Sequence, residues 1–316
     1  MSFTTQIKEE ITQDKGQKSV LIALLSAYIR NNGDFLKENI TMTTENKFLV
    51  DYIVEIIKQL YQKELKVEVI ENLNFSKKDL YQISIPKTEN KILEDLGVYD
   101  EQKNYLETVP EYIVGANEEI RGYLKGAFLA VGSINDPKTS RYHMELLVSK
   151  PKESVFIQKL LNLFDLNAKI LSREKGYMIY IKEAEKISDF IKILGANKAV
   201  MYYEDVRVYR DKKNKTNRLN NCEQANMDKI IQNASSQLED IDIIEKNDAV
   251  MLLDDKVKEA LKYRKEYPEA SLKELAEIIS LETNKSITKS GLNHRLKKIK
   301  ELADSFRKID KEKVQR

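Results

Sequence analysis

The stretch Gly122-Tyr-Leu-Lys-Gly-Ala-Phe-Leu-Ala-Val-Gly132 combines small and large apolar side chains at helical spacing. Its small residues are Gly126, Ala127 and Ala130. A glycine inside a helix costs about 1 kcal/mol relative to alanine, so it usually has a packing reason. An earlier segment with similar spacing of small residues ends at Gly33. The pattern predicts a helix that packs closely against a partner helix.

The same order of elements surrounds both of these helices. Apolar spacing predicts helix, two strands and helix, then two more strands and a closing helix, once over about 17–97 and again over about 118–195. Gly33 and Gly132 are 99 residues apart in this repeat. Two copies of such a unit favour a pseudo-symmetric α+β domain, residues 1–200, with two four-stranded sheets.

Strand patterns end near residue 200, and the remaining sequence predicts an all-α domain. Residues 201–222 are predicted to form a basic linker, since 207–218 hold six Lys or Arg and one acid. Helices are then expected over 223–244 and 256–267. Two further short helices, separated by a polar break, predict a helix-turn-helix over about 271–303 within a helical domain spanning 223–316.

Positive charge is concentrated at this end of the chain. Residues 285–316 carry eleven Lys or Arg against four acids, a net charge of +7, whereas the whole chain sums to only +2. A near-neutral protein with one basic end is expected to bring that end to a polyanion. Double-stranded DNA is the partner that the basic helix-turn-helix indicates.

Composition excludes several other classes of protein. One cysteine and two histidines cannot form a Cys/His zinc cluster or an internal disulfide framework. The sequence contains no glycine-rich phosphate-binding motif, no apolar run near twenty residues and no secretory signal. We therefore expect no cofactor, no metal and no membrane partner, and a cytoplasmic location on the nucleoid. Cys222 is expected to be a small buried thiol, and His143, beside Glu145, a structural residue.

Residues 124–132 and, more loosely, 25–33 resemble the LAGLIDADG homing endonucleases. In that family an acid before the final glycine of each helix holds the catalytic metals, and the corresponding residues here are Asn32 and Val131. Neither supplies the anionic oxygen that Mg²⁺ needs. The resemblance thus implies an inactive scaffold and no enzyme. Asp34 and Asp136 leave a metal-dependent nuclease open as an alternative, although their expected role is turn formation.

A resemblance to the WhiA family covers nearly the whole chain. It is carried by five blocks of sequence in order, residues 1–10, 126–137 with 142–145, 217–226, 267–275 and 288–299. This resemblance implies a bacterial DNA-binding transcriptional regulator with a degenerate LAGLIDADG domain and a C-terminal helix-turn-helix. It further implies roles in cell division and chromosome segregation, and in sporulation among spore-forming relatives.

The second helix of the helix-turn-helix contains an apolar stripe, formed by Leu292, Leu296, Ile299 and Ala303. Thr288 is expected to cap this helix and to lie at the DNA. The start of a recognition helix usually meets the bases, and later residues meet the phosphates. The base-reading candidates are Lys289, Ser290, Asn293 and His294, and the phosphate candidates are Arg295, Lys297, Lys298 and Lys300. The alternative for Lys297, Lys298 and Lys300 is a solvated basic surface.

The linker supplies a second set of candidate contacts. Lys213, Lys215, Asn217 and Arg218 are expected to reach DNA phosphates, while the amides at 217–226 are favoured as caps of the following helix. Another transcription or cell-division protein is a further candidate partner. A division-associated scaffold with incidental DNA contact therefore remains an alternative function, and the sequence does not fix the oligomeric state.

Overall fold

The described residues divide into two units, 1–211 and 212–316. The structure, a computed structural model, describes residues 1–36, 39–70, 79–139 and 141–314. The parts of the predicted repeats and helical domain at 37–38, 71–78, 140 and 315–316 lie outside the described residues. Each unit has its own hydrophobic core.

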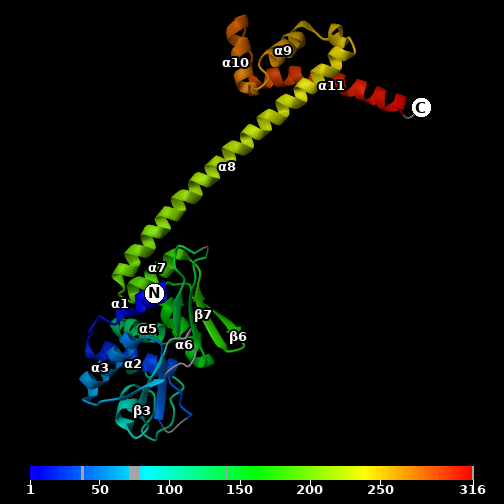
Figure 1. Ribbon diagram of the computed structural model, residues 1–316. Coiled ribbons are helices and arrows are strands. Elements are labelled where there is room, and N and C mark those ends of the chain that lie inside the picture. The colour runs from blue at the N-terminus through cyan, green and yellow to red at the C-terminus, as the bar shows by residue number, and fades with distance from the viewer. Residues whose placement is uncertain (37–38, 71–78, 140, 315–316) are drawn as a thin grey trace. The chain divides into compact units, whose positions relative to one another are not determined.

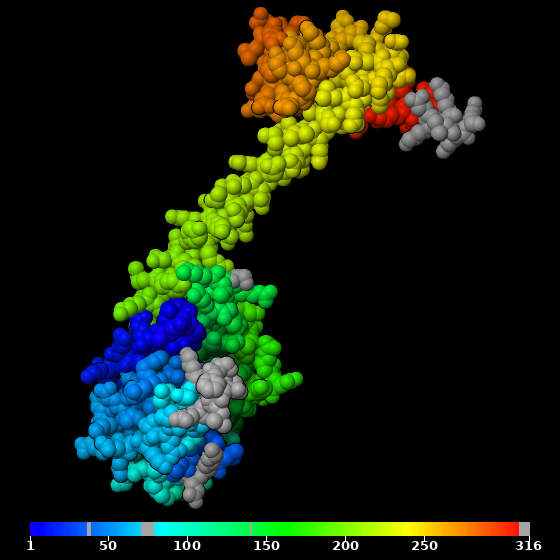
Figure 2. Space-filling model, in the orientation of Figure 1, coloured from blue at the N-terminus to red at the C-terminus, as the bar shows by residue number. Residues whose placement is uncertain are grey.

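The first unit contains both predicted repeats. Its elements are α1 (Phe3–Ile11), α2 (Lys18–Asn32), β1 (Asn39–Thr44), α3 (Lys47–Tyr61), β2 (Lys66–Ile70), β3 (Leu80–Pro86), α4 (Asn90–Asp95), η1 (Glu111–Ile113), α5 (Asn117–Val131), β4 (Gly132–Ile134), β5 (Met144–Val148), α6 (Pro151–Asn162), β6 (Lys169–Arg173), β7 (Gly176–Ile181) and α7 (Ala184–Ile193). The residues of the two repeats lie next to each other on the surface of this unit (Figure 2).

Helices α2 and α5 lie side by side at the centre of the first unit (Figure 1). A Cβ atom on Gly126 would lie 2.0 Å from the carbonyl oxygen of Leu24, and one on Gly122 would lie 2.5 Å from that of Val20. Val20 faces Gly122, and Leu24, four residues later, faces Gly126, four residues later on α5. The two helices therefore run in the same direction. The predicted close packing at Gly126 is confirmed.

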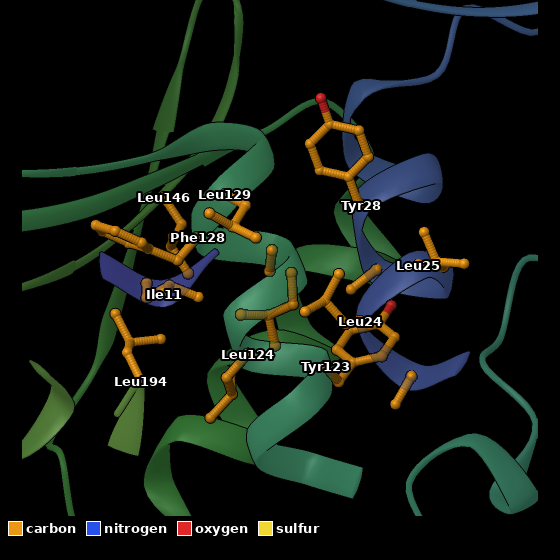
Figure 3. Close-up of a cluster of buried hydrophobic side chains, with 14 of the residues drawn as sticks. Ile11, Leu24, Leu25, Tyr28, Tyr123, Leu124, Phe128, Leu129, Leu146 and Leu194 are labelled. Atoms are coloured by element: carbon orange, nitrogen blue, oxygen red, sulfur yellow. The ribbon is translucent and has the colours of Figure 1, made fainter. Parts of the chain in front are cut away.

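Large apolar side chains flank this backbone contact. Leu24, Leu25 and Tyr28 of α2 and Tyr123, Leu124 and Phe128 of α5 are all at most 1 % exposed (Figure 3). They extend the core to both sides of the helix pair, where each repeat adds its own sheet and outer helices. The helix pair is thus shared between the two repeats.

Each repeat contributes one antiparallel sheet. The strand orders are β1-β3-β2 in the first repeat and β4-β5-β7-β6 in the second. Apolar residues face each other across the strands, as in the Met42–Ile83 pair and the Leu146–Ile179 pair. The predicted α+β class with two pseudo-symmetric repeats is confirmed.

The first sheet differs from the expected four strands within the described residues. Where the second repeat has β4, the first has a single bridge between Asp34 and Thr41. The Asp34 carboxylate accepts a hydrogen bond from the Leu36 backbone amide at 3.0 Å. Among the described residues, the first sheet therefore has three strands and this one bridge.

A buried ion pair joins the two repeats. Arg30 of α2 and Glu153 of α6 lie 3.3 Å apart with side chains at most 2 % exposed. Arg30 also donates to the carbonyl oxygens of Gly97 and Leu106, and the Tyr123 hydroxyl donates to Glu153. Because the charges are paired and further hydrogen-bonded, the arrangement avoids the several kcal/mol that an isolated buried ion would cost.

Helix α8 (Asn197–Lys246) begins in the first unit and ends in the second. Its first turn is fixed by Glu10, whose carboxylate accepts from the backbone amides of Lys198 and Ala199. The predicted linker, 201–222, lies within α8 and is helical throughout. No glycine or proline occurs between Asn197 and Lys246, so neither of these helix-breaking residues interrupts α8.

The second unit is all helical in the described residues. After α8 it contains η2 (Ala249–Leu252), α9 (Asp255–Glu266), α10 (Leu272–Thr283) and α11 (Lys289–Val314) (Figure 1). Helix α11 extends eleven residues beyond the predicted end at 303. Across the described ranges, no helix has the length and apolar character needed to cross a membrane.

The close approach of α2 and α5 gives a stability test. Gly126→Ala places a methyl group against the Leu24 backbone, which cannot rotate away as a side chain could. We expect the free energy of unfolding to fall by about 2 kcal/mol or more, despite the higher helix propensity of alanine. Urea denaturation followed by circular dichroism measures the change.

Gly115→Ala is the matched control. A Cβ atom there would meet its nearest neighbour at 3.4 Å, an ordinary contact distance. Equal effects of the two substitutions would contradict close backbone packing at Gly126.

Candidate nucleic-acid interface

The predicted apolar stripe of α11 lies in the core of the second unit. Leu292, Leu296, Ile299 and Ala303 are all at most 4 % exposed. They pack in one cluster with buried residues of α9 and α10. The stripe fixes the rotation of α11, and hence which of its residues face solvent.

Side-chain caps define where α10 and α11 begin. The Ser271 hydroxyl accepts from the Glu274 amide at 3.3 Å, and the Glu274 carboxylate accepts from the Ser271 amide at 2.8 Å. Thr288 Oγ1 accepts from the backbone amide of Gly291 at 3.1 Å, as expected of a residue that caps α11. Between the helices, Ser280 Oγ accepts from the Ile287 amide at 2.9 Å and holds the turn.

The predicted base-reading residues are exposed and lie on the first turns of α11. Ser290, His294 and Lys297 follow i, i+4, i+7 spacing on the side away from the stripe, with Asn293 beside them. The exposed candidates as a group are Thr288, Lys289, Ser290, Asn293, His294, Lys297, Lys298 and Lys300. The structure thus brings polar donors, acceptors and cations together on one accessible surface, which is the arrangement that base and phosphate contacts require.

Three of the predicted phosphate contacts have carboxylate partners, the longest pair being the exposed Lys297–Glu301 at 3.8 Å. Arg295, with its side chain only 19 % exposed, donates to Glu259 Oε2 at 2.9 Å and so joins α11 to α9. Lys298 lies 3.1 Å from Asp254, and this hydrogen bond lowers the pKa of the Asp254 carboxyl group. The exposed Lys298 pair contributes little stability and is easily exchanged for a phosphate, whereas the packed Arg295 pair is more costly to break.

The candidate linker contacts are part of α8. Lys213, Lys215, Asn217 and Arg218 are exposed, as is every residue from 211 to 229. The expectation that the amides at 217–226 cap a helix is wrong, because α8 is continuous through them. The expected burial of Cys222 is also wrong, since this thiol is exposed on the same stretch of helix.

The positions of the lost metal acids do not fit a catalytic metal. The Asn32 amide donates to the carbonyl oxygen of Thr43 at 3.2 Å and accepts from the Thr43 backbone amide at 3.3 Å. Val131 has no side-chain oxygen. One position is therefore used for backbone pairing, and the other offers no ligand to Mg²⁺.

The alternative acids are also engaged in local structure. Asp34 and Asp136 each accept from the backbone amide two residues later, in the turn geometry expected for aspartate. Asp136 additionally accepts from the Tyr202 hydroxyl of α8 at 3.1 Å. In the part of the chain that the structure describes, no group of three or more His, Cys, Asp or Glu is placed to hold a metal ion.

A groove of about 700 Å³ lies on the second sheet of the first unit. Its cations are Arg141, Arg173 and Lys182, and His143 Nε2 lies 3.0 Å from Glu145 in the same groove. The pairing with Glu145 agrees with the structural role expected of His143. Sequence reasoning missed the three cations because they come from segments up to 41 residues apart, and only the strand pairing brings them together.

Known proteins share both the sequence and the fold of this chain. Family models described as the WhiA N-terminal LAGLIDADG-like domain, the WhiA LAGLIDADG-like domain and the WhiA C-terminal HTH domain match residues 18–99, 120–213 and 216–303. A "Probable cell division protein WhiA" from Lysinibacillus sphaericus is 38 % identical over 98 % of this chain and 99 % of its own length. One with the same name from Staphylococcus saprophyticus is 41 % identical over 97 % and 98 %.

The crystal structure of full-length DUF199/WhiA from Thermatoga maritima covers 97 % of this chain and 99 % of its own, with a TM-score of 0.57 and 23 % identity. This likeness shows a shared fold. The fold and sequence together define a two-part protein, a LAGLIDADG-like domain followed by a helix-turn-helix domain. The chain belongs to the WhiA family, and the resemblance found in its sequence is confirmed.

The pairing of Asn32 with Thr43 gives a second stability test. Asn32→Asp removes the donor to the Thr43 carbonyl and places a carboxylate against that oxygen. At pH 7 we expect a loss of about 1–2 kcal/mol in the free energy of unfolding. The loss should shrink below about pH 4, where the introduced carboxyl group is protonated and donates again.

The measurement is urea denaturation at both pH values. Asn39→Asp, on the exposed start of β1, is the matched control and should change stability by less than about 0.5 kcal/mol. A deficit for Asn32→Asp that persists unchanged at low pH would rule out the pairing as its cause.

Proposed function

We propose that this protein is a DNA-binding transcriptional regulator that acts in bacterial cell division and chromosome segregation. The observation that carries the proposal is the exposed start of α11, where polar and basic side chains face away from a fully buried stripe. The names of the relatives, which are cell division proteins, support the cellular role. Location on the nucleoid in the cytoplasm follows from the same proposal, as does a sporulation role in sporulating relatives.

In this proposal α11 enters the major groove of duplex DNA. Lys289, Ser290, Asn293 and His294 reach base edges, where an amide suits adenine and an ammonium group suits guanine. Lys297, Lys298 and Lys300 then lie further along the helix, at the phosphates. Arg295 primarily holds α11 against α9 through Glu259, so its effect on DNA binding is one of positioning.

The first unit is proposed to have no nuclease activity. Its family is LAGLIDADG-like, but Asn32 pairs with backbone and Val131 carries no oxygen. Incubation of supercoiled plasmid with the protein and Mg²⁺ or Mn²⁺ is expected to leave the plasmid intact. Cutting that is abolished by Asp34→Asn or Asp136→Asn would instead establish the nuclease alternative.

Duplex binding by the full-length protein tests the proposed interface. Asn293→Ala with His294→Ala should weaken binding to a duplex selected from a random pool by roughly 10- to 100-fold, while the salt dependence stays unchanged. Lys297→Gln with Lys300→Gln should weaken all duplexes and lower the salt slope by about one for each phosphate that is no longer neutralised. Fluorescence anisotropy at several salt concentrations measures both effects.

The control for charge is Lys47→Gln with Lys91→Gln, two exposed lysines on α3 and α4 of the first unit. It changes net charge equally and should leave duplex binding unaltered. If it weakens binding as much as the α11 variants do, attraction by overall charge accounts for the data. Unaltered binding by both α11 variants would favour the protein-interaction scaffold.

A further inference from the structure

We infer that a pocket beside the helix-turn-helix binds a phosphate group through buried Arg264 and the first-turn backbone amides of α10. The pocket has a volume of about 270 Å³ and lies entirely within the second unit, between α8, the turn after α9, and the starts of α10 and α11. Phosphate binding at this pocket extends the proposed function. It rests on that function only if the phosphate is part of the DNA backbone. A free phosphate-bearing ligand is the other source of the same group.

Arg264 is a buried cation without an anionic partner among the described residues. It is 1 % exposed, and its Nη1 contacts only the neutral carbonyl oxygens of Tyr267, Pro268 and Ala270, of which that of Ala270 is the nearest at 2.7 Å. Its Nε, also buried, has no hydrogen-bond partner in the described part of the chain. Burial lowers the pKa of this guanidinium.

A buried guanidinium is stable when an anion satisfies its remaining donors. Glu153 does this for Arg30 in the first unit, but no Asp or Glu lines the pocket at Arg264 among the residues described there. The buried positive charge of Arg264 and the pocket's lack of a described carboxylate therefore point to an anion that comes from outside the chain.

The start of α10 supplies a second set of donors. Ser271 and Glu274 satisfy each other's backbone amides in a capping box. The amides of Leu272 and Lys273, in the first turn, have no intrahelical acceptor and both residues line the pocket. A helix N-terminus carries partial positive charge and orients such amides toward an anion.

The remaining pocket residues agree with an oxyanion. Lys273 and Lys289 add two ammonium groups, and the amides of Asn233 and Gln237 add neutral polar groups. The volume is slightly below the range of about 300–1,000 Å³ that is usual for small-molecule sites, so it suits a phosphate group rather than a dinucleotide.

The position of Lys289 relates the pocket to DNA. This residue lines the pocket and is also the first residue of α11, the proposed recognition helix. A backbone phosphate seated here would fix the start of α11 against the duplex without reading sequence. Arg264 and Lys273 would then contact DNA in addition to the residues of α11.

The first experiment measures inorganic phosphate binding to the full-length protein by calorimetry, against sodium chloride at equal ionic strength. Lys273→Gln and Arg264→Lys are each expected to weaken phosphate binding about ten-fold or more. Lys262→Gln, an exposed lysine of α9 outside the pocket, should bind as the unmodified protein does. Because Arg264 also holds the turn after α9, Lys273→Gln keeps the test valid if Arg264→Lys fails to fold.

The second experiment distinguishes the two sources of phosphate. If the occupant is a DNA phosphate, duplex DNA should compete with inorganic phosphate, and Lys273→Gln should weaken all duplexes and lower the salt slope by about one. If the occupant is a free ligand, phosphate should bind equally with and without duplex, and Lys273→Gln should leave duplex affinity unchanged.

Failure of the pocket and failure of the proposed function give different results. Duplex binding that depends on Asn293, without phosphate binding and without an effect of Lys273→Gln, would overturn the pocket alone. Phosphate binding that depends on Lys273, without any duplex binding, would overturn the proposed function and keep the pocket.

Discussion

The contact of the α5 backbone with the α2 backbone is the constraint on which the first unit depends. Gly122 and Gly126 let the carbonyls of Val20 and Leu24 approach to distances that a methyl group would prevent. Because the helices run in the same direction, both end at the same side of the pair. Each helix is then followed by the strands of its own repeat. One interface thus sets the pseudo-symmetry, the placement of both sheets and the positions of Asn32 and Val131.

The buried arginines of the two units have different partners. In the first, Arg30 meets Glu153 and a set of carbonyl oxygens, so the ion pair contributes a fixed geometry where the two repeats join. In the second, Arg264 meets carbonyl oxygens through Nη1, and its Nε donor is unused among the described residues. The first arrangement is complete within the chain, whereas the inferred phosphate would complete the second.

Regular elements were largely predictable from the sequence, and contacts between distant residues were not. Apolar periodicity correctly located α2, α5 and the stripe of α11, because burial of one side of a helix follows from spacing alone. The length of α8 was missed, since a run of amides and lysines indicates a linker by composition although it contains no helix-terminating residue. The Arg295–Glu259 pair and the pocket at Arg264 depend on tertiary packing, which no local pattern encodes.

The pairing of Asn32 with Thr43 ties residue 32 to the first sheet. The amide is used on both sides, since it donates to the Thr43 carbonyl oxygen and accepts from the Thr43 backbone amide. An acid introduced at residue 32 alone would weaken that pairing without creating a metal site, because Val131 would still offer no ligand. The two residues therefore depend on each other, and a change at either one alone costs stability or leaves the metal without a second ligand.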